Sequence, residues 1–474
     1  MNEKYDVIIV GAGPAGSMCA YELHEKNPSL AILLLDKGND IDHRRCPILE
    51  KKLTKCPERP DGVAGCYPAC SMTNGFGGSG AYSDGKFNIT SEYGGWMTDY
   101  LDATDVEELI NYVDAVNLKF GAPLEVTDPT TAKVREIERR GLAVGLKLLR
   151  GRVRHLGTEI NLKVLKNLYI DLSQKIAMRH RAEVTDIVVE SGAVCGVVLK
   201  DGTRIESDRI VVCPGRDGSR WLSDICEARG IPMHANHVDI GVRVETNNEI
   251  MEEINENLYE GKFVFRTTMG TQVRTFCSNP SGHVVIENFS GIMLANGHAY
   301  SDAGLGSKNT NFAILVSHDF TDPFHQPNEF AQGVSGLANM LSNGSIILQR
   351  YGDLKMGRRS TEKRIREGFV TPTLKEAVPG DLGLVLPYKT MMSIIEMIEA
   401  LDHVTPGIAS EHTLFYGVEA KFYSARPEVD DRFETRVKGL YVGGDGAGIT
   451  RGLAQAGANG VRIARAIAAK TIQK

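Results

Sequence analysis

The sequence predicts an α/β fold built around a parallel sheet, and three observations support this prediction. The first strand is followed at once by a glycine-rich turn, a helical segment and a second strand. A further helical segment, Asn161–His180, precedes the middle strands as a crossover helix would. Short apolar runs rich in Val and Ile recur far apart in the chain, at Asp6–Val10, Ala31–Leu35, Glu183–Glu190, Ala193–Leu199, Arg209–Cys213 and Gly439–Val442.

The composition narrows the classes of function. The chain has 474 residues, 42% of them hydrophobic and 24% charged, and its 50 glycines suit an α/β enzyme rich in tight loops. The net charge of -6 does not indicate a nucleic-acid or membrane surface. No apolar run is long enough to span a bilayer, and no secretory leader is visible. We therefore expect a cytoplasmic protein whose nine cysteines are thiols or ligands rather than structural disulfides.

The first strand, turn, helix and second strand form a dinucleotide-binding pattern. Gly11 suits the tight turn, Gly13 lets a pyrophosphate approach the backbone, and Gly16 lets the helix pack on the strand. The helix that begins near Pro14 offers its N-terminal amides to that pyrophosphate. Asp36 ends the second strand, where an acid accepts a hydrogen bond from a ribose hydroxyl. The pattern allows NAD, NADP or FAD, and the alternative is a βαβ unit without a ligand.

The spacing of the strands predicts one nucleotide domain assembled from three parts of the chain. A β-meander with a hairpin turn at Ser191–Gly192 belongs to its middle part. We expect the first and middle parts in residues 1–224, with a Cys- and Gly-rich insertion at 40–95. The last part covers residues 427–474, and an inserted α+β substrate or cap domain covers residues 225–426.

The C-terminal segment strengthens the dinucleotide prediction. Gly439–Ala468 reads GLYVGGDGAGITRGLAQAGANGVRIARAIA, a strand, a loop of small residues and a helix. It resembles the flavoproteins with two dinucleotide-binding domains of the glutathione-reductase-like fold. The resemblance implies that Asp445 binds the ribityl or pyrophosphate part of FAD, and that Gly452–Ala456 lie close to the flavin ring. A helix N-terminus there would stabilise the negative charge of reduced flavin. The alternative is a Gly-rich turn used only for packing.

Two narrower similarities extend the expected site. The segment IVVCPGRDG, with Gly215, resembles the strand that ends near FAD in that fold, and Val184 resembles the position whose backbone binds adenine. The motifs GFGGSGAYSDGKFN, MGRRSTEKRI and GDGAGITRGLAQA resemble a family of bacterial and archaeal FAD-dependent dehydrogenases, which implies a fold and a cofactor but no substrate. The alternative for the first motif is a structural loop without flavin contact. The full set of expected cofactor-binding residues is Gly11, Gly13, Pro14, Ala15, Gly16, Asp36, Lys37, Gly77, Gly78, Gly80, Val184, Gly215, Gly444, Asp445, Gly452, Leu453, Ala454, Gln455 and Ala456.

Four cysteines precede the glycine loop, at Cys46, Cys56, Cys66 and Cys70. In a reducing compartment their thiolates could ligate zinc or an iron–sulfur cluster. The last two form CxxxC rather than the common CxxC, so a redox-active pair and inert buried thiols are the alternatives.

Flavin carries the hydride, so the protein needs to position a substrate and supply a proton or an anion clamp. Lys86 and Asp84 are candidates if their loop lies over the ring, and Arg451 lies in the turn before the last helix. Arg358 and Arg359 form a basic pair that suits a carboxylate or phosphate, or else covers a solvated face. Four histidines are weaker candidates for acids, namely His234, His237, His298 and His412.

We therefore expect an FAD-dependent oxidoreductase that passes a hydride between flavin and an organic small molecule, such as reduction of a C=C bond or the reverse dehydrogenation. No second GxGxxG indicates a separate NAD(P)H domain, so the electrons come from a transient NAD(P)H, a redox partner protein or a cluster on the cysteines. The alternatives are an electron-transfer or redox-sensing flavoprotein and flavin-dependent RNA modification, although the acidic balance disfavours RNA.

Overall fold

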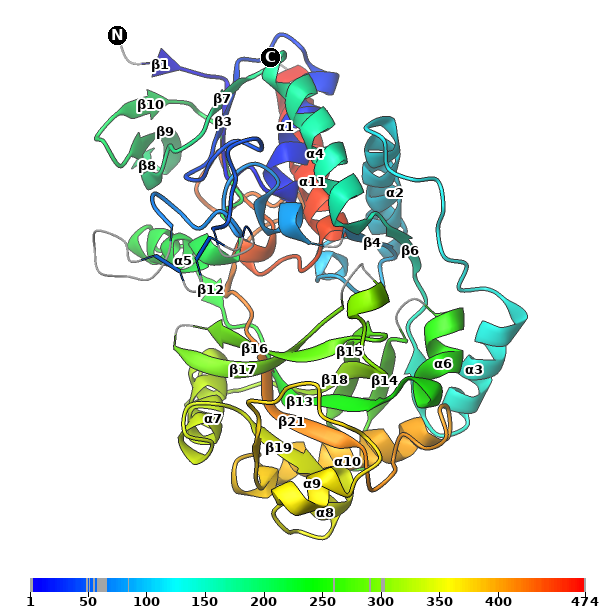
Figure 1. Cartoon of the computed structure of the whole chain (residues 1–474). Coiled ribbons are helices and arrows are strands. Elements are labelled where there is room, and N and C mark those ends of the chain that lie inside the picture. Colours follow the sequence, from blue (N-terminus) through cyan, green and yellow to red (C-terminus); the bar gives the residue numbers. More distant parts are fainter. Residues whose placement is uncertain are drawn as a thin grey trace. The chain divides into compact units, whose positions relative to one another are not determined.

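The computed structural model divides into two compact units (Figure 1). The first contains Met1–Val126, Gly151–His234 and Ser424–Lys474, and the second contains Thr127–Arg150 and Ala235–Tyr423. The structure describes residues 3–47, 50, 52–53, 56–57, 66–83, 85–258, 261–289, 291–299 and 303–472.

The first unit is built on a five-stranded sheet in which every pair of neighbouring strands is parallel. Its order confirms the prediction that the start, middle and end of the chain form one nucleotide-binding fold, because strands from all three parts lie side by side. The strands, in spatial order, are β23 (Leu440–Val442), β11 (Ile210–Val212), β2 (Val7–Val10), β3 (Ile32–Leu35) and β7 (Ala177–Arg179).

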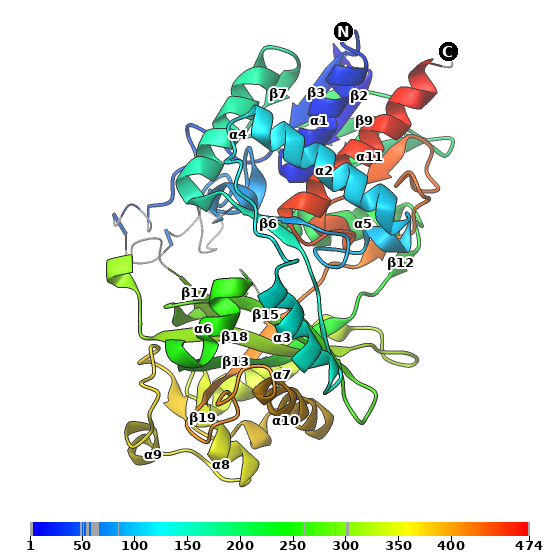
Figure 2. The ribbon, with the colours of Figure 1, turned by 90° about the vertical axis from the view of Figure 1, so that its right-hand side faces the viewer.

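Helices α1 and α11 lie side by side in the first unit, and α2 packs across α11 (Figures 1 and 2). The expected crossover helix Asn161–His180 is shorter than its apolar pattern indicated. It ends at Ser173, and three residues after a short turn form the edge strand β7. The helices are α1 (Pro14–Lys26), α2 (Ala103–Lys119), α4 (Gly157–Ser173), α5 (Ser219–Ala228) and α11 (Leu453–Ile472).

The remaining strands of the first unit form small sheets. The predicted meander is confirmed, and its turn residues Ser191 and Gly192 both have positive φ, as a tight hairpin requires. The meander consists of β8 (Val184–Glu190), β9 (Ala193–Leu199) and β10 (Arg204–Glu206), joined by β1 (Glu3–Lys4). Two pairs complete the unit, β4 (Lys86–Ile89) with β6 (Arg152–His155), and β12 (Met233–His234) with β22 (Arg426–Pro427).

The second unit contains an eight-stranded, mostly antiparallel sheet and a separate hairpin. The sheet order is β20 (Val378–Pro379), β19 (Ile347–Arg350), β21 (Leu414–Lys421), β13 (Val238–Asn247), β18 (Asn309–His318), β15 (Gln272–Asn279), β14 (Phe263–Arg266) and β5 (Leu146–Leu148). The hairpin consists of β16 (His283–Phe289) and β17 (Ile292–His298). The helices are α3 (Ala132–Leu142), α6 (Asn248–Asn257), α7 (Pro327–Leu341), α8 (Tyr351–Lys355), α9 (Glu362–Arg366) and α10 (Tyr388–Asp402).

The central strand β13 separates an apolar face of this sheet from a polar one. Val242 and Val244 belong to the apolar core that includes Ile394 of α10. Helix α10 packs against β13 (Figure 2). The alternate residues Arg243 and Glu245 are equally buried but charged. Because successive side chains of a strand point to opposite faces, the second face carries the buried charges.

The borders of the units differ from the expected domain borders. Residues 127–150, expected in the nucleotide domain, pack in the second unit, where β5 pairs with β14. The other borders fall after residues 234 and 423 rather than after 224 and 426. Local sequence did not indicate this because the pairing of β5 depends on residues more than a hundred positions away. Which unit binds substrate stays a prediction.

A helix that crosses a bilayer is long and apolar. Within the part of the chain that the structure describes, no helix combines the required length with sufficient apolar character.

Candidate functional site

The glycine turn after β2 is closely packed at two of its three glycines. Gly11 has a φ of +100°, and a Cβ there would lie 2.1 Å from the carbonyl oxygen of Cys213. A Cβ on Gly16 would lie 1.9 Å from the carbonyl oxygen of Gly11. A Cβ on Gly13 would meet only the Cα of Gly78, at 3.8 Å. The first and third glycines are therefore required for packing, whereas Gly13 leaves space beside the helix N-terminus.

The second glycine motif, Gly77–Gly80, packs against this turn. The Gly77 amide donates to the Ala12 carbonyl at 2.8 Å. Gly77 and Gly78 have φ values of +84° and +54°, which side chains rarely adopt. A Cβ on Gly78 would lie 3.1 Å from the Cα of Gly13. The two glycine motifs, far apart in the sequence, thus bring their backbones together.

The C-terminal loop joins the same region. Gly444 has a φ of +74°, and its Cβ position lies 3.4 Å from the Cβ of Ala15 at the start of α1. A Cβ on Gly446 would lie 2.3 Å from the carbonyl oxygen of Gly215. The Asp445 carboxylate accepts from the Thr450 hydroxyl at 2.7 Å. Strand ends from the start, middle and end of the chain therefore meet here.

Two helix N-termini converge at Gly80. The position of a Cβ on Gly80 lies 2.6 Å from the Leu453 side chain and 3.6 Å from that of Pro14. Leu453 is the first residue of α11 and Pro14 the first of α1. The N-terminal ends of both helices, which carry the positive ends of the helix dipoles, therefore lie near each other at Gly80, and this favours an anionic group.

Asp36 lies at the end of β3, next to the glycine turn. Its carboxylate accepts from the backbone amides of Ala12 at 2.8 Å, Gly38 at 2.7 Å and Gly75 at 2.9 Å. An ionised carboxylate has about four acceptor positions, so a further hydrogen bond fits. Asp36 thus links the first two glycine motifs, and its contact with a ribose stays a prediction.

His180 was not predicted from the sequence, where a lone histidine gives no signal. It follows the edge strand β7, and its ring lies 5.7 Å from that of Tyr169, which in turn packs on Phe76 of the glycine loop. Both ring nitrogens are buried and have no hydrogen-bond partner among the described residues. Burial lowers the pKa of His180, while nearby Asp36 and Asp40 act in the opposite direction. A ring near Asp36 whose two nitrogens are buried and unpartnered among the described residues fits the polar part of a nucleotide.

Other residues of the expected site make structural contacts. Lys37 forms an ion pair with Asp217 at 2.6 Å. The side-chain amide of Gln455 donates to the Tyr93 carbonyl, and the backbone amide of Arg451 donates to the Gly94 carbonyl, so the start of α11 is tied to this segment.

The last expected residues lie on several elements of the first unit. Ala454 and Ala456 are buried in α11, and Val184 begins β8 in the meander rather than in the five-stranded sheet. Lys86 begins β4, and Asp84 lies outside the described residues. Their proposed roles stay predictions.

The predicted metal site at the four cysteines is not confirmed. Among the described residues, no three His, Cys, Asp or Glu side chains are arranged to hold a metal ion. Burial raises the pKa of the Cys66 thiol, and the thiols of Cys70, Cys46 and Cys56 raise it further. All eight cysteines whose side chains are described are free thiols, as expected.

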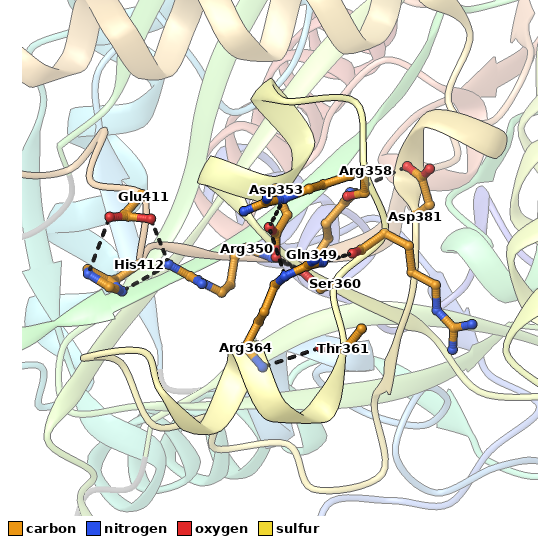
Figure 3. Close-up of polar contacts among 11 residues, drawn as sticks. Gln349, Arg350, Asp353, Arg358, Ser360, Thr361, Arg364, Asp381, Glu411 and His412 are labelled. Carbon is orange, nitrogen blue, oxygen red and sulfur yellow. Dashed lines mark hydrogen bonds and ion pairs between the residues drawn. The ribbon is translucent and has the colours of Figure 1, made fainter.

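The basic pair of the MGRRSTEKRI motif is held within the second unit (Figure 3). The buried carboxylate of Asp353 accepts from Arg358 Nε and from the Ser360 hydroxyl, both at 2.7 Å. Gln349 donates to the Arg358 carbonyl at 2.9 Å, and Arg359 donates to the Pro379 carbonyl at 3.3 Å. These contacts support a structural role for Arg358, which fastens the turn between α8 and α9.

The four candidate histidines lie in different places. His412 contacts Arg350 Nη2 at 3.2 Å (Figure 3). It also packs on the Phe369 ring. His298 ends β17, His234 is exposed in β12, and His237 precedes β13.

Comparisons with protein families agree with this arrangement. Residues 9–41 match the model of the NAD(P)-binding Rossmann-like domain, and residues 237–422 match the model described as FAD-dependent protein, C-terminal domain-like. These matches confirm the resemblance drawn from the sequence. They indicate a Rossmann-like domain and an FAD-dependent-protein domain in this chain, and they assign no particular reaction.

The individual relatives are distant from this chain. An uncharacterized protein of Clostridium beijerinckii is 26% identical over 98% of this chain and 80% of its own length. Formate oxidase of Aspergillus oryzae aligns over 100% of both chains at 12% identity, with a TM-score of 0.45. Glycine oxidase of Bacillus cereus aligns over 98% of this chain and 95% of its own, at 12% identity and a TM-score of 0.36. These similarities are too low to indicate a substrate.

Proposed function

We propose that this chain is an FAD-dependent oxidoreductase that transfers a hydride between flavin and an organic small molecule. The observation that carries the proposal is the convergence of Gly13, Gly78 and Gly444 at the N-termini of α1 and α11. These residues come from three separate motifs, and no packing need alone explains the room left beside Gly13. The family matches support FAD as the ligand.

In this proposal, different residues of the first unit bind different parts of FAD. The amides at the start of α1 hold the pyrophosphate, while Asp36 and His180 bind the adenosine part. Asp445 binds the ribityl chain, and the N-terminus of α11 stabilises negative charge on the ring. When bound, FAD supplies a hydride acceptor or donor to the site. Proton transfer by Lys86, Asp84 or Arg451, and reduction of a C=C bond, are the finer parts of the proposal.

The test is an anaerobic absorbance spectrum of the purified protein, titrated first with NADH and NADPH and then with dithionite. We expect a flavin spectrum with about one FAD per chain released on denaturation, and bleaching by dithionite. Protein that contains no flavin and does not bind added FAD would contradict the proposal. Bleaching by NAD(P)H would support a transient nicotinamide donor, and resistance to it would favour a redox partner protein.

A further inference from the structure

One end of the large sheet in the second unit carries a cluster of charged and polar side chains. It lies on the polar face, where β13, β15, β18 and β21 are neighbours. We call it the Arg274 cluster, and it consists of His237, Asp239, Arg274, Ser317, Glu419, Lys421 and Tyr423.

Asp239 anchors the first cation of this cluster. Its carboxylate is fully buried and lies 3.0 Å from Arg274 Nη2. The Ser317 hydroxyl donates to the same carboxylate at 2.6 Å, and the Tyr423 hydroxyl is a third donor. The Arg274 guanidinium also lies 5.1 Å from the centre of the Phe276 ring, which limits its rotation. Arg274 is therefore held in a defined position before any ligand arrives.

Glu419 anchors the second cation. Its side chain is fully buried, with Lys421 Nζ at 3.0 Å and Arg243 Nε at 2.9 Å. Lys421 on β21 lies opposite Asp239 on β13 in the strand register. The ammonium of Lys421 and the guanidinium of Arg274 are thus each paired with a different buried carboxylate of the same sheet face.

The carboxylates of the cluster are buried, whereas its cations are partly exposed. The side chains of Asp239 and Glu419 are 0% exposed, whereas those of Arg274 and Lys421 are 24% and 17% exposed. The exposed edge of the cluster is therefore positive. Arg243 also pairs with Glu419, so the three cations Arg243, Arg274 and Lys421 face two carboxylates, and these five groups carry a formal charge of one positive unit.

The guanidinium of Arg274 is only partly used by the protein. Its contacts with Asp239, His237 and Ser317 are all made by Nη2, and its buried Nε has no partner among the described residues. Since arginine can only donate, this contact with His237 Nε2 at 3.3 Å requires the tautomer in which Nε2 is the acceptor. A buried donor without a partner is costly, and an anionic ligand would relieve that cost.

We propose that the Arg274 cluster binds a carboxylate group, and that the substrate of this protein is therefore an organic acid. That the bound ligand is the substrate rests on the function proposed above, whereas carboxylate binding does not. A single positive charge and a planar guanidinium match a monoanionic carboxylate better than a dianionic phosphate. The pair Arg274 and Lys421 binds the ligand, and Asp239 and Glu419 are positioning residues.

The test is calorimetric titration of the flavin-loaded protein with sodium acetate, succinate and benzoate, with sodium phosphate and sodium chloride at equal ionic strength for comparison. We expect saturable heat with at least one carboxylate and none with chloride. Arg274→Gln and Lys421→Gln should each weaken binding about tenfold or more, and Arg274→Lys should lose less. The matched control is Arg266→Gln on the neighbouring strand β14, since this exposed arginine contacts the Gly270 carbonyl and lies outside the cluster.

Melting temperatures of the unliganded variants show whether each is folded, and Lys421→Gln replaces Arg274→Gln if the latter is not. The inference is overturned if no carboxylate binds, if phosphate alone binds, or if folded Arg274→Gln binds as the unaltered protein does. Flavin content is measured separately on the same samples. Protein without FAD would overturn the proposed function, and flavin-loaded protein that binds no carboxylate would overturn this inference alone.

Discussion

At the scale of the residue, His180 stands out among the described residues of the first unit because both of its ring nitrogens are buried without a hydrogen-bond partner. These nitrogens lie near Asp36. We expect His180→Ala to raise the Kd for FAD about five- to tenfold, the equivalent of one neutral hydrogen bond. The measurement is quenching of flavin fluorescence when FAD is added back to apoprotein.

The control for this measurement is His403→Ala, because His403 is exposed at the end of α10 in the second unit. If both variants bound FAD as tightly as the unaltered protein does, His180 would not bind the cofactor. A loss of affinity in both would indicate a general effect of the substitutions rather than a contact with FAD.

At the scale of the element, the contact between α1 and α11 depends on one glycine. A Cβ on Gly460 would lie 1.9 Å from the carbonyl oxygen of Ala15, a backbone atom that cannot rotate away. Gly460→Ala should therefore lower the free energy of unfolding by about 1–3 kcal/mol and reduce the FAD content. Gly333→Ala in the middle of α7 is the matched control, since its Cβ would meet no atom within 4 Å. It should raise stability by about 0.5–1 kcal/mol.

Urea unfolding followed by circular dichroism gives both values, with FAD content measured on the same samples. If Gly460→Ala were as stable as Gly333→Ala, the two helices would not be held at the distance that the structure shows. If Gly460→Ala lowers the free energy of unfolding and Gly333→Ala raises it, the loss comes from the contact between α1 and α11 rather than from helix propensity.

The elements also show which parts of the fold can be read from sequence. The strands β2, β3 and β11 were predictable because buried parallel strands are continuous apolar runs. The glycine motifs were predictable because a positive φ or a close backbone contact leaves little choice of residue. The edge strand β7 was mistaken for the end of a helix, because three residues are too few to show a period. The Arg274 cluster was missed because it joins four strands that are distant in sequence.

At the scale of the whole molecule, the expected cofactor residues and the charged sheet belong to different units. Every expected FAD-binding residue lies in the first unit, including those from the C-terminal segment. Sequence order alone indicated three separate segments, and the pairing of β11 with both β2 and β23 shows why they form one body. A ligand that binds only this body should stabilise it without stabilising the other unit directly.

Removal of FAD therefore has an expected pattern in hydrogen exchange. Saturation at a hundred times the Kd contributes about 2.7 kcal/mol, so exchange limited by opening of the first unit should be about a hundredfold faster in apoprotein. The effect belongs to peptides from α1, β11 and α11, while peptides from β13 and β18 serve as the internal control. An equal increase in both sets would mean that the units unfold together, and no increase in the first set would mean that FAD does not bind there. Because the two sets are measured in one sample, differences in pH or temperature cannot imitate the expected result.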